Sequence, residues 1–190
     1  MILSPSFDNF PLANYPYMKN PFQKSYSNEE ISLFTFLSGI RVFEKLSDEE
    51  KALFIPYLYP RKYKQDEIVF FRKDPSHALY LIKRGKVSIF HEAGEEMEVL
   101  NQIGSSHSFG NNALIHDTNR IYNAIVHSKD AELYVIPHVN IMDIFSANPK
   151  VQAKMLASLT EMYDEYTKQL FVSYKSSKGF FSLDLLYTTF

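Results

Sequence analysis

The chain has 190 residues, 45% of them apolar, and a net charge of −2 at pH 7, which suits one globular domain with a sizeable core. It contains no cysteine, so disulfides, thiolate zinc sites and thiol nucleophiles are excluded. No apolar run reaches the roughly 18 residues of a membrane span, and no Lys/Arg run offers the cationic face that direct nucleic acid binding requires.

Residues 1–26 form an aromatic and proline-rich N-terminal extension. Its regularly spaced prolines exclude a helix; they are Pro5, Pro11, Pro16 and Pro21. The extension has neither the charged start nor the continuous apolar core of a signal peptide, so we expect a cytoplasmic protein. We expect the extension to lie over the domain or over a partner.

Two capping-box spacings, each a serine three residues before a glutamate, predict helices within residues 27–60. The pairs are Ser27 with Glu30 and Ser47 with Glu50. The first helical pattern ends near Gly39. Pro56 should kink or shorten the second helix, and Pro60 should close it.

Six short segments rich in β-branched and aromatic residues follow within residues 61–138, separated by turn signals. They read EIVFFR, ALYLIKRG, KVSIFHE, EMEVLNQIG, YNAIVHS and AELYVIP. Several short strands at this spacing are typical of an antiparallel sandwich or barrel. The segment FGNNALI, which begins at Phe109, interrupts the strands and predicts a turn followed by one helical turn.

Helical patterns return in residues 139–175, where Asn148 and Pro149 give a strong helix start. The longer helix carries a stripe with heptad-like spacing, formed by Leu156, Leu159, Tyr163, Tyr166 and Leu170. Such a stripe indicates either packing on the helix's own core or a homodimer through residues 150–172. The tail, residues 176–190, again mixes aromatic and small polar residues.

The order of elements predicts a mainly β protein with flanking helices. We expect a double-stranded antiparallel β-roll, jelly-roll-like, with N-terminal helices before it and one long C-terminal helix after it. The expected layout is an extension (1–26), N-terminal helices (27–60), the roll (61–138), C-terminal helices (139–175) and a tail (176–190).

Residues 109–120, FGNNALIHDTNR, have the parts of a phosphate cradle. Gly110 lets backbone N–H groups approach an anion closely. The helical turn that follows adds a favourable N-terminal dipole, and Arg120 supplies a forked, permanently charged partner.

This stretch resembles the phosphate-binding cassette, residues 109–121 here, of cyclic-nucleotide-binding domains, as in protein kinase A regulatory subunits and the catabolite activator family. That family has a Phe-Gly-Glu-x-Ala-Leu turn followed by an Arg. The resemblance extends over roughly residues 40–165. FEKLSDEEKALFIPYL resembles the leading helix, YKQDEIVFFRKDPSHALYLIKRGKVSIF the first strands with Gly85, and IGSSHSFG the approach to the cassette with Gly104.

The resemblance implies a cyclic nucleotide, cAMP or cGMP, or another small anionic ligand, and no cofactor. Its phosphate contacts would be Gly110, Asn112, Ala113, Arg120 and Ile121. The residue at the ribose position would be Asn111, and the candidates for contact with the base are Tyr122, Tyr163 and Tyr166. Ligand binding would shift the cassette against the C-terminal helix and so signal to an effector protein.

The sequence departs from the family's pattern at several positions, one of which is a missing turn glycine in KQDE. Asn111 stands where the family has a glutamate, and an amide loses the charge assistance of a carboxylate. Ile121 and Tyr122 stand where the family favours small residues, and Tyr122 either crowds the phosphate pocket or stacks on a base. Two of the site residues also have a purely structural interpretation. Asn111 could be a helix cap, and Arg120 could be a surface arginine or a partner of Asp117.

Two hypotheses on function follow. The first is a non-catalytic cyclic-nucleotide sensor that signals through its C-terminal helix. The second is a relative that no longer binds nucleotide, in which Tyr122 fills the empty cradle and the aromatic ends serve as an interaction or dimerisation surface. No helix-turn-helix follows Lys175, so we expect no DNA-binding domain. The six histidines show no His-x-His pair and no Gly-x-Ser-x-Gly motif occurs, so neither a metal site nor catalysis is expected.

Overall fold

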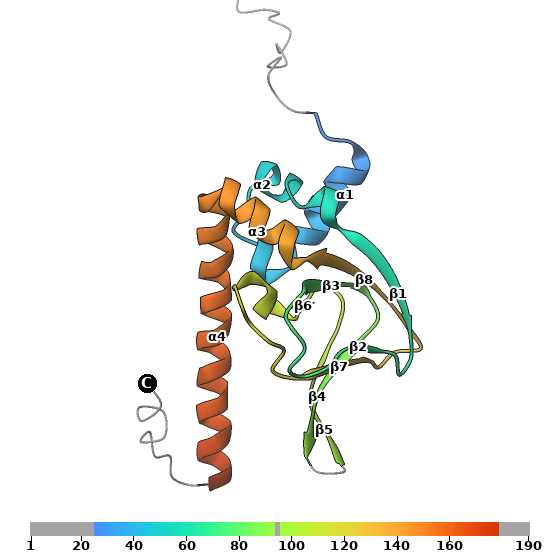
Figure 1. Cartoon of the computed structure of the whole chain (residues 1–190), viewed down its shortest axis with the longest axis vertical. Coiled ribbons are helices and arrows are strands. Elements are labelled where there is room, and N and C mark those ends of the chain that lie inside the picture. Colours follow the sequence, from blue (N-terminus) through green and yellow to red (C-terminus); the bar gives the residue numbers. More distant parts are fainter. Residues whose placement is uncertain (1–24, 94–95, 179–190) are drawn as a thin grey trace, which may run out of the picture.

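The computed structural model describes residues 25–93 and 96–178 (Figure 1). The predictions for residues 1–24 and 179–190 lie outside the described residues. The first part of the chain is helical. It consists of α1 (Asn28–Ser38), the short 3-10 turn η1 (Arg41–Phe43), α2 (Asp48–Ala52) and a second 3-10 turn η2 (Ile55–Tyr57).

Both predicted capping boxes are present. The Ser27 hydroxyl accepts from the Glu30 N–H at 3.2 Å, and the Glu30 carboxylate accepts from the Ser27 N–H at 2.7 Å. Ser47 and Glu50 form the same pair of bonds, at 3.3 and 2.8 Å. Each box satisfies two backbone donors that have no partner within the helix, and so fixes where the helix begins.

The helical region ends earlier than the sequence pattern indicated. Pro56 lies in η2 and α2 is only five residues long, as a proline without an N–H and with a fixed φ requires. Pro60 lies within strand β1 rather than closing a helix, and it pairs with Tyr134. β1 is an edge strand, where the missing N–H of a proline is tolerated.

The described residues contain eight strands in two antiparallel four-stranded sheets, which confirms the predicted β-roll with flanking helices. One sheet has the order β1-β8-β3-β6, formed by Tyr59–Lys64, Asp130–Pro137, Ala78–Arg84 and Ser108–Phe109. The other has the order β2-β7-β4-β5, formed by Ile68–Phe70, Asn123–Val126, Val87–Ala93 and Glu96–Ile103.

Strand β3 is buried on both faces, because the roll's interior lies on one side of it and the helices on the other. Leu79 and Leu81 belong to the core shared with the helices, whereas Ile82 belongs to the core inside the roll, with Tyr80 packed against it. This alternation follows the period of two of a strand. The helices therefore pack on the outer face of the β1-β8-β3-β6 sheet.

After the roll come α3 (His138–Ala147) and the long helix α4 (Pro149–Lys178), which Figure 1 shows running alongside the roll. The first half of α4 packs on the helical core through residues that are almost fully buried, namely Val151, Met155, Leu159 and Met162. Of the predicted stripe, Tyr166 and Leu170 are instead exposed. The N-terminal part of the stripe thus packs on the chain's own core. For the exposed part of the stripe, the homodimer stays a prediction.

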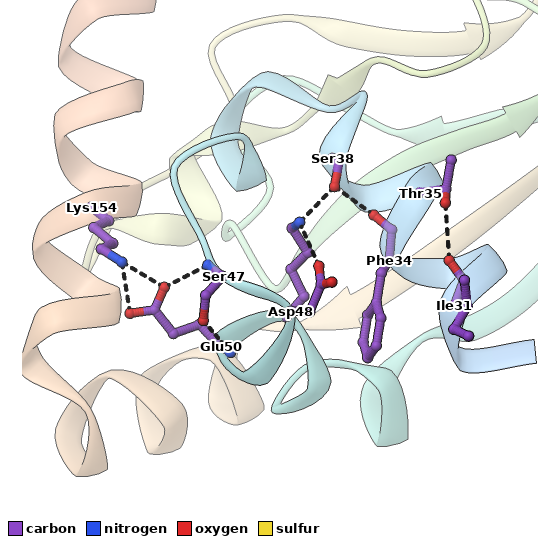
Figure 2. A network of polar contacts seen from close by, with 9 residues as sticks. Ile31, Phe34, Thr35, Ser38, Ser47, Asp48, Glu50 and Lys154 are labelled. Atoms are coloured by element: carbon purple, nitrogen blue, oxygen red, sulfur yellow. Dashed lines mark hydrogen bonds and ion pairs between the residues drawn. The ribbon is translucent and has the colours of Figure 1, made fainter. Parts of the chain in front are cut away.

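Ion pairs hold α4 to the N-terminal helices. Lys154 on α4 reaches Glu50 at 2.7 Å, and the same carboxylate accepts the Ser47 N–H of the capping box (Figure 2). Arg41 pairs with Glu165 and Lys45 pairs with Glu161 further along α4. Within residues 25–93 and 96–178, no helix is long and apolar enough to cross a bilayer.

Candidate ligand-binding site

The predicted cradle begins at Gly110, between β6 and the 3-10 turn η3 (Asn111–Leu114). Gly110 has φ 69°, in the left-handed region that glycine adopts without steric cost. A Cβ at this position would lie 2.5 Å from Nη1 of Arg120 and 3.3 Å from Cδ2 of Tyr80. The glycine is therefore required twice, by the backbone turn and by the close approach of Arg120.

Arg120 points into the protein and is only 3% exposed. Its Nη1 donates to the Gly110 carbonyl at 2.8 Å, and its Nη2 donates to the Ala78 carbonyl at 2.6 Å. Burial lowers the pKa of the guanidinium, but an arginine remains charged at neutral pH. The surface position and the pairing with Asp117 considered from the sequence are both wrong, because Arg120 is buried and both of its Nη atoms donate to backbone carbonyls, while its Nε has no partner among the described residues.

Aromatic rings complete the environment of this buried cation. The guanidinium carbon lies 4.3 Å from the ring centre of Phe70 and 5.6 Å from that of Tyr80. A cation over a ring face is attracted by the ring quadrupole, more strongly when it is desolvated. Phe70 and Tyr80 were missed by sequence reasoning, because their strand pattern shows that they face the core but not which side chain they meet there.

Tyr122 closes the other side of the cradle. Its hydroxyl accepts a hydrogen bond from the Gly110 N–H at 3.0 Å, and its ring lies 5.7 Å from that of Phe70. Burial raises the pKa of Tyr122 to about 12, although the Gly110 N–H and the charge of Arg120 oppose this rise. Tyr122 is therefore a neutral phenol at physiological pH, and its hydroxyl occupies the Gly110 N–H, one of the predicted phosphate contacts.

The Asn111 side chain is 8% exposed, and its Oδ1 accepts no hydrogen bond from the described residues. The cap role considered for it is wrong, because η3 has no side-chain cap. Ala113 is fully buried, and its N–H donates to the Gly110 carbonyl at 3.1 Å. The Asn112 carbonyl accepts from the Thr118 hydroxyl at 2.8 Å. Ile121 is 62% exposed.

A cavity of about 580 Å³ lies between the cassette, strand β5 and helix α4. The structure brings together at this cavity six of the predicted site residues, which are Asn111, Asn112, Ile121, Tyr122, Tyr163 and Tyr166. Gly110, Ala113 and Arg120 do not line it. The volume is in the usual range of small-molecule sites. Three of the predicted phosphate contacts, Gly110, Ala113 and Arg120, are thus separated from the cavity that the predicted base contacts line.

Sequence reasoning missed several residues of the cavity wall, among them Leu100 on β5 and Leu170 and Ser173 on α4. The stripe on α4 pointed to Leu170 only as a residue of a core or an interface. Among the described residues, no group of three His, Asp or Glu side chains could hold a metal ion.

Residues 60–148 match the family model described as the cyclic nucleotide-binding domain. The match identifies residues 60–148 as a domain of the cyclic nucleotide-binding family. The cyclic AMP receptor protein of Thermus thermophilus is 29% identical to it over 136 residues, which are 70% of this chain and 62% of that relative. The chain therefore spans less than two thirds of the length of this relative.

Solved structures superpose on the chain. The catabolite activator protein of Thermus thermophilus has a TM-score of 0.60 and 27% identity, over 71% of this chain and 64% of its own. The N-terminal domain of a transcriptional regulator from Streptomyces coelicolor has a TM-score of 0.62 over 71% of this chain and 94% of its own. At 18% identity, the second likeness shows the fold alone.

Proposed function

We propose that this chain is a non-catalytic regulatory module of the cyclic nucleotide-binding family that senses a ligand in the cavity between the roll and α4, and that its phosphate cradle is closed to cAMP and cGMP. The observation that carries the proposal is the Tyr122 hydroxyl on the Gly110 N–H, with Arg120 buried behind it. This arrangement favours the second of the two hypotheses as far as the nucleotide is concerned.

The closed cradle would weaken cyclic-nucleotide binding because a phosphate has to displace bonds that already exist. To face a phosphate, Arg120 has to leave the Gly110 and Ala78 carbonyls. A hydrogen bond to a charged group contributes about 1.5–3 kcal/mol, and each 1.4 kcal/mol is about tenfold in affinity. Releasing Arg120 therefore weakens binding by about a hundredfold or more.

The cavity supports signalling through α4, because a ligand there touches the roll and the helix at once. Tyr163 and Tyr166 line the cavity from the part of α4 that follows its buried half. A ligand shifts an arrangement only by its differential affinity for the two states. The exposed end of α4 is then the surface for an effector protein or for the predicted homodimer through residues 150–172, of which the part after Met162 is mostly exposed. Sedimentation equilibrium of the chain and of Leu170→Glu tests the homodimer, which a monomeric chain would exclude.

Calorimetric titration with cAMP and cGMP tests the closed cradle. We expect no heat of binding with the wild-type chain and measurable binding with Tyr122→Ala, which restores the small residue that the family favours. Tyr122→Phe is the matched intermediate: it frees the Gly110 N–H but keeps the ring in the cradle, so its affinity should lie between those of the wild-type chain and Tyr122→Ala. The gain should disappear in Tyr122→Ala combined with Arg120→Lys, because a lysine lacks the fork that binds a phosphate bidentately.

One result would overturn the proposal. Micromolar binding of either nucleotide to the wild-type chain, about −8 kcal/mol, that is lost in Arg120→Lys would mean that Tyr122 moves aside and Arg120 turns outward. The chain would then be a cyclic-nucleotide sensor of the family's usual kind.

A further inference from the structure

Two adjoining cavities form one groove between strand β5 and helix α4. The cavity of about 580 Å³ lies next to a second cavity of about 480 Å³. The second cavity is also lined by Arg41 and Glu165, which are paired with each other. The two cavities, together named the β5–α4 groove, share five lining residues, which are Asn101, Ile103, Ser108, Tyr166 and Gln169.

The groove runs along the free edge of β5. Consecutive residues of a strand point to opposite faces of the sheet, yet residues 100–103 all line the groove. A groove in contact with consecutive residues lies beside the strand rather than over one of its faces. Within residues 25–93 and 96–178, β5 pairs with β4 alone. Its other edge therefore presents backbone groups that can pair with one more extended segment.

Large apolar side chains lie exposed around the groove. Four of those that line it are at least half exposed, namely Leu100, Ile121, Tyr166 and Leu170. A gathering of exposed apolar side chains marks an interaction surface, and covering it is favourable in proportion to the apolar area removed from water. A strand edge beside an apolar helix face suits an extended segment that is apolar on one face.

The residues that follow α4 have this pattern. Residues 179–190 read GFFSLDLLYTTF. Their apolar side chains recur at every second position, which is the period of a strand, and these are Phe181, Leu183, Leu185 and Tyr187. Between them stand Ser182, Asp184 and Leu186. The sequence thus supplies a segment with one apolar face directly after the helix that borders the groove.

The segment is long enough to cover the whole groove. It begins after Lys178, the last residue of α4, and Met162 lines the far part of the groove. The helix between these two residues is about 24 Å long. An extended chain with the length of residues 179–190 spans about 40 Å. The segment can therefore turn back beside α4 and reach Met162.

We propose that residues 179–190 bind in the β5–α4 groove of their own chain, along the free edge of β5, with the side chains of residues 181, 183, 185 and 187 facing the groove. This inference rests on the proposed function, because the bound segment competes with the ligand of the regulatory cavity. Its attachment to α4 gives it a high effective concentration at the groove. A ligand that fills the cavity displaces the segment and exposes this face of α4 to an effector protein.

The absence of cysteine from the chain allows a direct test. Ser173→Cys places a single thiol, the groove thiol, at an exposed position that lines the groove. Its rate of alkylation by iodoacetamide measures how much of the time the groove is uncovered. Val139→Cys supplies the control thiol, because Val139 is 61% exposed on α3 and does not line the groove.

Two double variants of the segment separate binding from added charge. Leu183→Asp with Leu185→Asp places two charges on the apolar face, so the groove thiol should react at least tenfold faster. Tenfold corresponds to about 1.4 kcal/mol, which is less than the burial of one leucine side chain contributes. Ser182→Asp with Thr188→Asp adds the same charge at polar positions and should leave the rate as it is in the wild-type segment. The control thiol should react equally in all three chains.

Equal reactivity of the groove thiol in all three chains would overturn the inference. The groove would then be either open or covered by other residues, such as 1–24. A reactivity that falls as the protein concentration rises would also overturn it, because a second copy would then cover the groove. No nucleotide enters these measurements, so they leave the closed cradle to the separate titration with cAMP and cGMP.

Discussion

Replacing Gly110 by alanine should destabilise the fold by roughly 3 kcal/mol or more, because two costs arise at one position. Gly110 has φ 69°, and a side chain in this left-handed region costs about 1–2 kcal/mol. The new Cβ would also lie 2.5 Å from Nη1 of Arg120. The guanidinium would have to leave the Gly110 carbonyl, which gives up a charged hydrogen bond of about 1.5–3 kcal/mol.

Urea unfolding followed by circular dichroism measures the loss in free energy, and thermal unfolding followed by the same signal gives the melting temperature. In a chain of this length, 1 kcal/mol corresponds to roughly 2–4 °C, so the melting temperature should fall by roughly 6–12 °C. Gly39→Ala is the matched control, since Gly39 has φ −77° and its added Cβ would meet no atom closer than 3.5 Å. The control should stay within about 1 kcal/mol of the wild-type chain.

Equal stabilities of Gly110→Ala and Gly39→Ala would refute this reasoning. A double-mutant cycle with Arg120→Lys separates the two costs, because the lysine has no planar fork to meet the new Cβ. In the Arg120→Lys background, Gly110→Ala should lower the free energy of unfolding only by the backbone strain. If Gly110→Ala lowers it equally in both backgrounds, the contact with Arg120 contributes nothing.

Two further predictions concern pH. Burial raises the pKa of Tyr122 to about 12 from about 10. The stability that depends on the neutral phenol is therefore complete below about pH 10. As the pH rises through about 12, the free energy of unfolding should fall by roughly 2–3 kcal/mol. Urea unfolding along this range should show a steeper decline for the wild-type chain than for Tyr122→Phe, and parallel curves would contradict the burial. Glu50→Gln should cost roughly 0.5–1 kcal/mol at neutral pH, since Lys154 is partly exposed and solvent screens the pair. The hydrogen bond from Lys154 lowers the pKa of Glu50. The difference in stability between the wild-type chain and Glu50→Gln should therefore vanish as the pH falls through the lowered pKa. An equal loss of stability at neutral and at acid pH would show that the ion pair contributes nothing.

Features fixed by neighbouring residues were predictable from the sequence. The capping boxes of Ser27 and Ser47 lie within four residues of chain, and their bonds form as expected. Pro56 shortened its helix for the same local reason. The prediction that Pro60 closes a helix was wrong, because Pro60 lies in a strand and pairs with Tyr134, which is distant in the sequence.

The candidate site depends on contacts across the fold, which spacing alone does not encode. The interval from Phe109 to Arg120 is the same whether the guanidinium faces an anion or turns inward. The inward direction is set by the Ala78 carbonyl, 42 residues away in the sequence, and by the ring of Phe70. The cavity could not be predicted either, because it forms only where α4 lies beside β5.

The inward position of Arg120 also gives a reason for the cassette to keep its arginine without a phosphate. Removing the guanidinium would remove one charged hydrogen bond from each of the Gly110 and Ala78 carbonyls, at about 1.5–3 kcal/mol each, and would leave the Gly110 carbonyl with only the Ala113 N–H as a donor. The Tyr122 hydroxyl plays the matching part, since it takes the Gly110 N–H that would otherwise lack an acceptor. Arginine, glycine and tyrosine are therefore bonded to one another, and each has a structural role that is independent of any nucleotide. A Phe-Gly turn followed by an arginine is accordingly evidence of the roll, whereas evidence of phosphate binding has to come from where the guanidinium points.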